Sequence, residues 1–131
     1  MDPVLRGARS HAALGAGIAA VLWLVLGAAA PAWSHAFPDH SEPRVGHTVD
    51  VPPSAVRIWF DGDIEPVFST IRVEGPDKQR VDSGDAWVDA GDRTLLEVSL
   101  PPLPSGAYHV VWSVVARDGH RTEGSFPFRI K

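Results

Sequence analysis

Sulfur is nearly absent from this chain. It contains no cysteine, and its single methionine is Met1. A domain without cysteine has no disulfides and depends on the packing of its core. Any metal site after Met1 must therefore use nitrogen and oxygen donors, because the soft sulfur ligands that favour Cu(I) are missing.

The chain also lacks a basic cluster and a second long apolar run. Its formal charge is −4, from 12 basic and 16 acidic residues. Nucleic-acid binding depends on clustered Lys and Arg that neutralise phosphates, so we expect no nucleic-acid partner. Residues 12–30 form the one apolar stretch that approaches the length of a membrane span. We therefore expect the chain after this stretch not to be inserted in a membrane.

This apolar stretch belongs to a three-part pattern typical of a secretory signal peptide. Arg6 and Arg9 precede it, and Pro31 ends it just before the small residues Ala32 and Ser34. We predict cleavage after Ser34 by the general export route, because the two arginines are not adjacent, as the twin-arginine route requires. An uncleaved membrane anchor is the alternative interpretation, since the run approaches the ~20 residues that span a bilayer.

Cleavage would separate a signal peptide, residues 1–34, from a mature domain, residues 35–131. The 97 remaining residues fit one compact domain. Cleavage would remove two basic residues and one acidic residue. The mature domain would then have 10 basic and 15 acidic residues and a formal charge of −5. We expect this mature domain to be a monomer.

After residue 34 the apolar residues alternate in short segments that end at Pro, Gly or Asp. Such period-two alternation is typical of β-strands. Strands are predicted over residues 56–60, 68–73, 80–81, 86–88, 94–100, 107–116 and 124–130. About seven short strands without a helical period predict an all-β fold, either a Greek-key sandwich or a small barrel. The core face of the segment 107–116 is predicted to consist of Tyr108, Val110, Trp112 and Val114.

Cleavage after Ser34 would make His35 the first residue of the mature protein. The free α-amine and the imidazole Nδ1 of an N-terminal histidine can bind one metal ion together in a six-membered chelate. An N-terminal His35 is therefore a candidate metal ligand that only processing creates.

A second candidate ligand group, Asp118-Gly119-His120, lies near the other end of the chain. The glycine permits a tight backbone path, so the carboxylate and the imidazole can be directed at one point. Asp-Gly is also the commonest hairpin turn. The spacing alone therefore favours a simple turn with His120 in solvent.

Longer motifs favour the metal site. Residues 106–120, GAYHVVWSVVARDGH, and 124–128, GSFPF, resemble the C-terminal signature of the CopC family of periplasmic copper-resistance proteins. The first mature residues, His35-Ala36-Phe37 and Ser41-Glu42-Pro43 with Gly46, are similar to the family's mature N-terminus. VRIWF at 56–60 and EPVFS at 65–69 resemble its next strand and loop. The resemblance covers essentially all of residues 35–131.

This resemblance implies a cupredoxin-like β-domain of immunoglobulin-like shape in the periplasm, with one Cu(II) per chain. The implied ligands are the α-amine and ring nitrogen of His35, a nitrogen of His120 and a carboxylate oxygen of Asp118. Three nitrogens and one oxygen suit the tetragonal preference of Cu(II). The implied role is copper sequestration, copper resistance or delivery to an inner-membrane copper transporter, without enzymatic activity.

Some members of this family also carry a Met-rich loop that binds Cu(I). No methionine lies in residues 35–131, so we expect a variant without that site. His47 is interpreted as a surface loop histidine, and His109 as a partly exposed strand residue. His40 is interpreted as a solvated residue of the N-terminal segment, with weak axial ligation of the metal as the alternative.

The acidic group Asp61, Asp63 and Glu65 follows the strand predicted at 56–60. Calcium loops need more oxygen donors in a defined order, which this segment lacks. We therefore interpret the acidic group as a solvated turn.

Two other classes of function remain open. An N-terminal histidine that chelates copper with a second histidine is also found in lytic polysaccharide monooxygenases. However, 97 residues leave little area for a polysaccharide platform, and a carboxylate ligand disfavours the Cu(I) that oxygen activation requires. A metal-free interaction module is the other class, since β-sandwiches carry many functions. A copper carrier is the function we favour.

Overall fold

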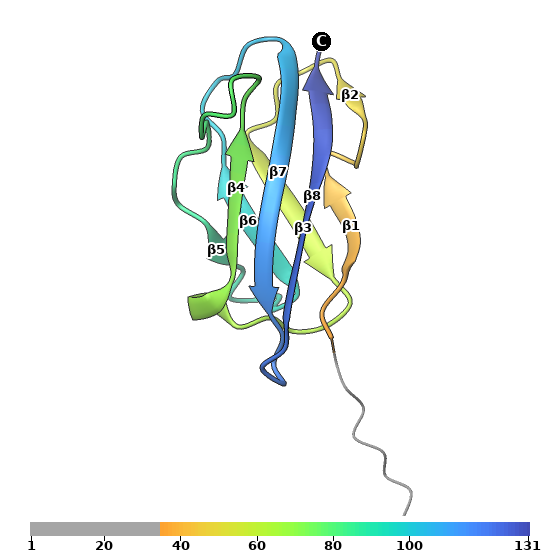
Figure 1. The fold of residues 1–131 in the computed structure, drawn as a ribbon, viewed down its shortest axis with the longest axis vertical. Helices are drawn as coiled ribbons and strands as arrows, with labels where there is room; N and C mark the ends of the chain where they lie inside the picture. Colours follow the sequence, from red (N-terminus) through yellow and green to blue (C-terminus); the bar gives the residue numbers. More distant parts are fainter. Residues whose placement is uncertain (1–34) are drawn as a thin grey trace, which may run out of the picture. The chain divides into compact units, whose positions relative to one another are not determined.

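A computed structural model describes residues 35–131, so the predicted signal peptide and its cleavage after Ser34 lie outside the described residues. The described part contains eight strands and one short 3-10 turn, η1 (Figure 1). Their bounds are β1 Pro38–Glu42, β2 Thr48–Val49, β3 Ala55–Phe60, η1 Pro66–Phe68, β4 Thr70–Glu74, β5 Trp87–Val88, β6 Leu95–Ser99, β7 Gly106–Val115 and β8 Arg121–Ile130. No helix in this range is long and apolar enough to cross a membrane.

The strands form two four-stranded sheets that pack face to face as a sandwich (Figure 1). One sheet has the order β1-β3-β6-β5, and the other has the order β2-β8-β7-β4. Successive strands alternate between the sheets, except for the consecutive pairs β5–β6 and β7–β8. The pairings are antiparallel, except that β2 lies parallel to β8. The predicted all-β sandwich is therefore confirmed.

Alternation of apolar residues located the long strands better than the short elements. β3 and β7 lie where the alternation predicts them. Phe68, the first residue of the strand predicted at 68–73, instead lies in η1, because the restricted φ of Pro66 favours a turn. The predicted strand at residues 80–81 is wrong, because Arg80 forms only an isolated bridge with Glu74.

The strands β1 and β2 have no counterpart in the alternation pattern. β1, with the sequence PDHSE, lies at the edge of its sheet and buries only Ser41. β2 has only two residues, which pair with the last residues of β8. Hydrophobic periodicity cannot predict strands that bury so little apolar surface.

The core lies between the two sheets and is built by alternate residues of the long strands. All four residues predicted for the core face of β7 are buried, with exposed fractions between 0 and 7 %. Burial of each such large side chain contributes about 1.5–3 kcal/mol. Aromatic contacts join the sheets, since the Trp112 ring meets Phe60 of β3 edge-on with centroids 5.2 Å apart.

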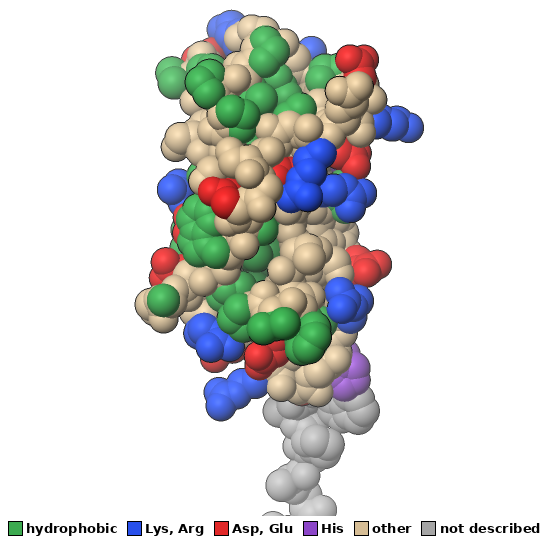
Figure 2. Space-filling model, turned by 90° about the vertical axis from the view of Figure 1, so that its left-hand side faces the viewer, with side chains coloured by type: hydrophobic (Ala, Val, Ile, Leu, Met, Phe, Trp, Pro, Cys, Tyr) green, Lys and Arg blue, Asp and Glu red, His purple; other side chains and the backbone are tan. Residues whose placement is uncertain are grey.

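The side of the sandwich formed by the edge strands β4 and β5 shows basic and acidic side chains interspersed (Figure 2). Arg72 pairs with Glu74 at 3.0 Å, and Arg80 pairs with Asp82 at 2.9 Å. Two of the basic side chains on this side of the sandwich are thus paired with acidic ones.

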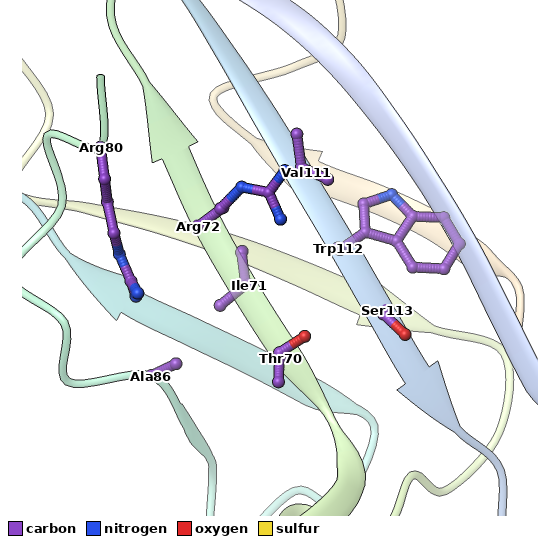
Figure 3. A pocket seen from close by; sticks show the side chains of 8 residues that line it. All are labelled: Thr70, Ile71, Arg72, Arg80, Ala86, Val111, Trp112 and Ser113. Carbon is purple, nitrogen blue, oxygen red and sulfur yellow. The ribbon is translucent and has the colours of Figure 1, made fainter. Parts of the chain in front are cut away.

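Close packing between β7 and β8 depends on a glycine. Trp112 lies opposite Gly124 in the register of the two strands, and its ring reaches from β7 toward β8 (Figure 3). A Cβ atom at position 124 would lie 2.5 Å from Cζ2 and 2.8 Å from Cε2 of the Trp112 ring. Only glycine leaves room for this ring.

Gly124→Ala is expected to lower the free energy of unfolding by about 1–3 kcal/mol, because the added methyl group overpacks the Trp112 ring. Urea unfolding followed by circular dichroism measures this loss. In a Trp112→Phe background the same substitution should cost less, since the smaller ring leaves space. An equal cost in both backgrounds would show that Trp112 is not the cause.

Candidate metal centre

The first three described residues, His35, Ala36 and Phe37, form an N-terminal arm that is held against one end of the sandwich. Ala36 is fully buried in the hydrophobic core, and its carbonyl accepts a hydrogen bond of 2.6 Å from the Thr122 hydroxyl on β8. The Phe37 N–H donates to Oδ1 of Asp61 at 2.7 Å. The arm therefore carries His35 to the beginning of β8.

A tight hairpin between β7 and β8 carries the other two predicted ligands. Its backbone is closed by the Ala116 N–H, which donates to the His120 carbonyl at 2.8 Å, and by the Gly119 N–H, which donates to the Ala116 carbonyl at 2.9 Å. Gly119 has φ +90°, in the region that favours glycine. Oδ1 of Asp118 accepts the His120 N–H at 3.0 Å and so completes the turn.

The arm and the hairpin bring the three predicted ligand residues together. The imidazole rings of His35 and His120 have centroids 4.8 Å apart and planes tilted by 56°. Oδ2 of Asp118 lies 3.0 Å from Nδ1 of His120. Two imidazoles and a carboxylate from opposite ends of residues 35–131 thus form one cluster.

The ionisation of the Asp118 carboxyl is set mainly by the hairpin. The His120 backbone N–H is the largest cause that lowers the pKa of the Asp118 carboxyl, partial burial opposes the shift, and the imidazoles of His120 and His35 lower it further. Hydrogen bonds and nearby positive charge both favour the ionised form. Asp118 is therefore held as a carboxylate, the form that binds metal ions.

The donor types of the cluster fit a borderline metal ion such as Cu(II), which accepts imidazole nitrogen and carboxylate oxygen. As the side chains stand, no three His, Asp or Glu groups within residues 35–131 have a geometry that could hold a metal ion. In the uncleaved chain Ser34 precedes His35, so the backbone nitrogen of His35 is a peptide amide and not a free amine. Rotation of the side chains and release of this amine by cleavage would be needed for coordination.

Two further histidines, His40 and His47, make other contacts. The His40 ring stacks on Trp59 with centroids 4.4 Å apart, and its Nδ1 lies 2.8 Å from Asp39. His47 is exposed, and its carbonyl accepts the Arg129 N–H near the C-terminal end of β8. The expected surface position of His47 is confirmed. His40 is exposed as expected, although its ring lies on an aromatic side chain rather than in open solvent.

Two residues of this site were not recognised from the sequence. Thr122 had no assigned role, and Asp61 was interpreted only as part of a solvated turn. Asp61 is exposed, but its carboxylate holds the backbone of the arm. No sequence signal marks these contacts, because each joins the arm to a segment distant in the chain.

A separate cavity of about 220 Å³ lies over β4 and β7 (Figure 3). Its two basic side chains are Arg72 and Arg80, which are paired with Glu74 and Asp82. Because these arginines are already neutralised, the cavity has no evident charge to bind an anionic ligand. The histidine and aspartate cluster is therefore the stronger candidate site.

A cysteine-free β-sandwich with two imidazoles and a carboxylate at one end defines a small domain suited to metal binding through nitrogen and oxygen. Residues 39–131 match the model of the CopC domain, and the chain belongs to the CopC family. This finding confirms the family resemblance. The CopC family consists of periplasmic proteins of copper binding and copper resistance.

Curated relatives support the assignment. Protein YobA of Escherichia coli (strain K12) is 33 % identical over 100 residues, which cover 76 % of this chain and 81 % of the relative. Copper transport protein CutJ of Bacillus subtilis (strain 168) is 29 % identical over 99 residues. These residues cover 75 % of this chain but only 18 % of CutJ.

Solved structures share the fold. CopC from Methylosinus trichosporium OB3b superposes with a TM-score of 0.70 and 30 % identity, over 74 % of this chain and 94 % of that chain. PcoC, a methionine-rich copper resistance protein from Escherichia coli, has a TM-score of 0.65 and 24 % identity. The match covers 75 % of this chain and 100 % of that chain. At this lower identity PcoC supports the fold alone.

In the copper-free protein, the Asp118 carboxyl should titrate below its ordinary pKa of 3.8. Its stabilising contribution is therefore present above the ordinary pKa and is lost as the pH falls through the lowered value. Carbon-13 NMR of the side-chain carboxyl measures this titration. Gly119→Ala strains the turn, because φ is +90°, and should raise the pKa toward 3.8.

His120→Ala is the matched variant for this titration, because it keeps the backbone N–H that is the largest cause of the shift. In His120→Ala the Asp118 pKa should stay below 3.8 but should be higher than in the unchanged protein. Complete loss of the shift in His120→Ala would identify the ring, and not the backbone, as the main cause.

Proposed function

We propose that residues 35–131 form a periplasmic Cu(II)-binding domain, which binds one cupric ion at the end of the sandwich where the N-terminal arm meets the hairpin. Cleavage after Ser34 completes the site by releasing the α-amine of His35. The contact between the His35 and His120 rings, with centroids 4.8 Å apart, is the observation that carries this proposal.

The ligands in this proposal are the α-amine and a ring nitrogen of His35, a ring nitrogen of His120 and a carboxylate oxygen of Asp118. The amine and the imidazoles must lose their protons to bind the metal, so affinity falls as the pH is lowered. Residues 35–131 offer no thiolate or thioether. The site therefore retains Cu(II) in preference to Cu(I).

The biological role in this proposal is copper sequestration, resistance or delivery to an inner-membrane copper transporter. The relative CutJ is named a copper transport protein, which supports a role of this chain in copper transport. Exposed apolar side chains also lie on segments at this end of the sandwich, since Phe37, Val67 and Phe68 are 54, 84 and 59 % exposed. Such side chains suit transient contact with a partner protein.

Blocking the α-amine of His35 should lower Cu(II) affinity at least about tenfold, which corresponds to ~1.4 kcal/mol. The sharpest block is N-terminal acetylation of the mature protein, because an extra residue would bring its own amine. Electron paramagnetic resonance with one equivalent of Cu(II) should show the loss of an equatorial nitrogen. The unfolding midpoint of the copper-free protein should not change.

His120→Ala provides the comparison for the acetylated protein, since it removes one ring nitrogen and leaves the amine free. Both proteins should lose affinity to a similar extent. Acetylated protein that binds Cu(II) as tightly as the free-amine form would contradict the proposed ligand set.

Asp118→Asn should raise the Cu(II)/Cu(I) reduction potential, because the variant removes the only anionic donor of the proposed site. Voltammetry of the copper-loaded protein measures the potential. The matched control is Asp85→Asn, since Asp85 likewise accepts a backbone N–H, that of Ser99 at 2.9 Å, at the other end of the sandwich. An equal potential in both variants would remove Asp118 from the coordination sphere.

A further inference from the structure

We propose that Thr122 and Asp61 are positioning residues for the copper site. The Thr122 hydroxyl and the Asp61 carboxylate, named here the arm clamp, hold the N-terminal arm so that His35 lies beside His120 before copper binds. This inference rests on the proposed Cu(II) function, because it explains how one of the proposed ligands is held.

The first half of the arm clamp lies on the strand that follows His120. Thr122 is two residues after His120, so in extended backbone the two side chains leave the same side of the chain. Its hydroxyl donates to the Ala36 carbonyl at 2.6 Å, directly next to His35. The segment from His120 to Thr122 thus carries one proposed ligand, His120, and also holds Ala36, which follows the other ligand residue His35.

The second half of the arm clamp, Asp61, both accepts a hydrogen bond from the arm and donates one to it. Oδ1 of Asp61 accepts the Phe37 N–H at 2.7 Å, and the Asp61 N–H donates to the Phe37 carbonyl at 2.8 Å. These bonds extend the pairing of β1 with β3 beyond its last pair, Pro38 with Phe60. The side chain of Asp61 therefore adds a bond that the backbone pairing alone does not supply.

The loop that carries Asp61 also holds the hairpin. The Arg117 N–H donates to the Asp63 carbonyl at 3.2 Å, and Ile64, which is fully buried, forms a bridge with Ala116. One loop therefore contacts both the arm with His35 and the hairpin with His120. Changes at Asp61 can loosen the arm while the hairpin keeps its own contacts.

The clamp affects copper binding through the entropy of the arm. An arm without these hydrogen bonds would become ordered only when copper binds. The loss of its conformational entropy would then make binding weaker. Burial of Ala36 sets the depth of the arm, and the clamp limits its movement along the surface. Loss of the clamp should therefore appear mainly as faster dissociation of Cu(II).

The test uses mature protein that begins at His35, with Thr122→Val and Asp61→Ala as the disrupting variants. Thr122→Ser keeps the hydroxyl, and Asp61→Asn keeps an oxygen acceptor, so each should restore the hydrogen bond. Dissociation of Cu(II) into excess chelator should be about tenfold faster in the disrupting variants, as is typical for residues that orient metal ligands. The conservative variants should dissociate at nearly the unchanged rate.

A second measurement needs no copper. In the metal-free protein, exchange of the Phe37 amide with solvent should be faster in Thr122→Val and Asp61→Ala than in their conservative partners. Ser105→Ala is the matched control, because the Ser105 hydroxyl donates to the Lys131 carbonyl at 2.6 Å at the opposite end of the sandwich. This variant should change neither the dissociation rate nor the exchange of Phe37.

The outcomes separate the two proposals. If unchanged mature protein binds no Cu(II) through nitrogen, the proposed function fails, while amide exchange still reports whether the clamp holds the arm. If it binds Cu(II), but both disrupting variants keep the unchanged dissociation rate and amide exchange, the clamp is overturned alone. Conservative variants that behave as badly as the disrupting ones would also overturn it, because packing and not hydrogen bonding would then be responsible.

Discussion

Burial of Ala36 is the constraint on which the candidate site depends. This small side chain is fully enclosed by the core, so the backbone on either side of it must lie against the end of the sandwich. His35 is then delivered to the hairpin between β7 and β8, where its ring meets that of His120. The site is thus a consequence of how the sandwich is closed at this end, and not of a loop that folds independently.

The hairpin contributes chemistry as well as position. Its tight turn places the Asp118 carboxylate against a backbone N–H and beside two imidazoles, which lowers the pKa of the carboxyl. A carboxylate held in this way is available to a cation without first losing a proton. The same turn depends on Gly119, whose positive φ is unfavourable for residues with a side chain. The turn Asp118-Gly119-His120 therefore determines both the lowered pKa of the carboxyl and the backbone path that positions the two side chains.

The sequence predicted those parts of the molecule that leave a periodic or local signal. The buried face of β7 follows from alternation, and the turn at Asp118-Gly119-His120 follows from its residue types. The proximity of His35 to His120 was expected only from family resemblance, since it arises from contacts between segments distant in sequence. Asp61 and Thr122 were missed for the same reason: their partners are backbone atoms of the arm, and such pairing is not encoded in any spacing along the chain.

The two ends of residues 35–131 have different surroundings in this fold. The arm lies at the end with the hairpin, whereas Lys131 lies at the other end, where its N–H donates to the carbonyl of Val49 in β2 (Figure 1). A fusion or surface linkage made through Lys131 would consequently leave the histidine cluster facing outward. The histidine cluster and the attachment point at Lys131 thus lie at opposite ends of the same sandwich.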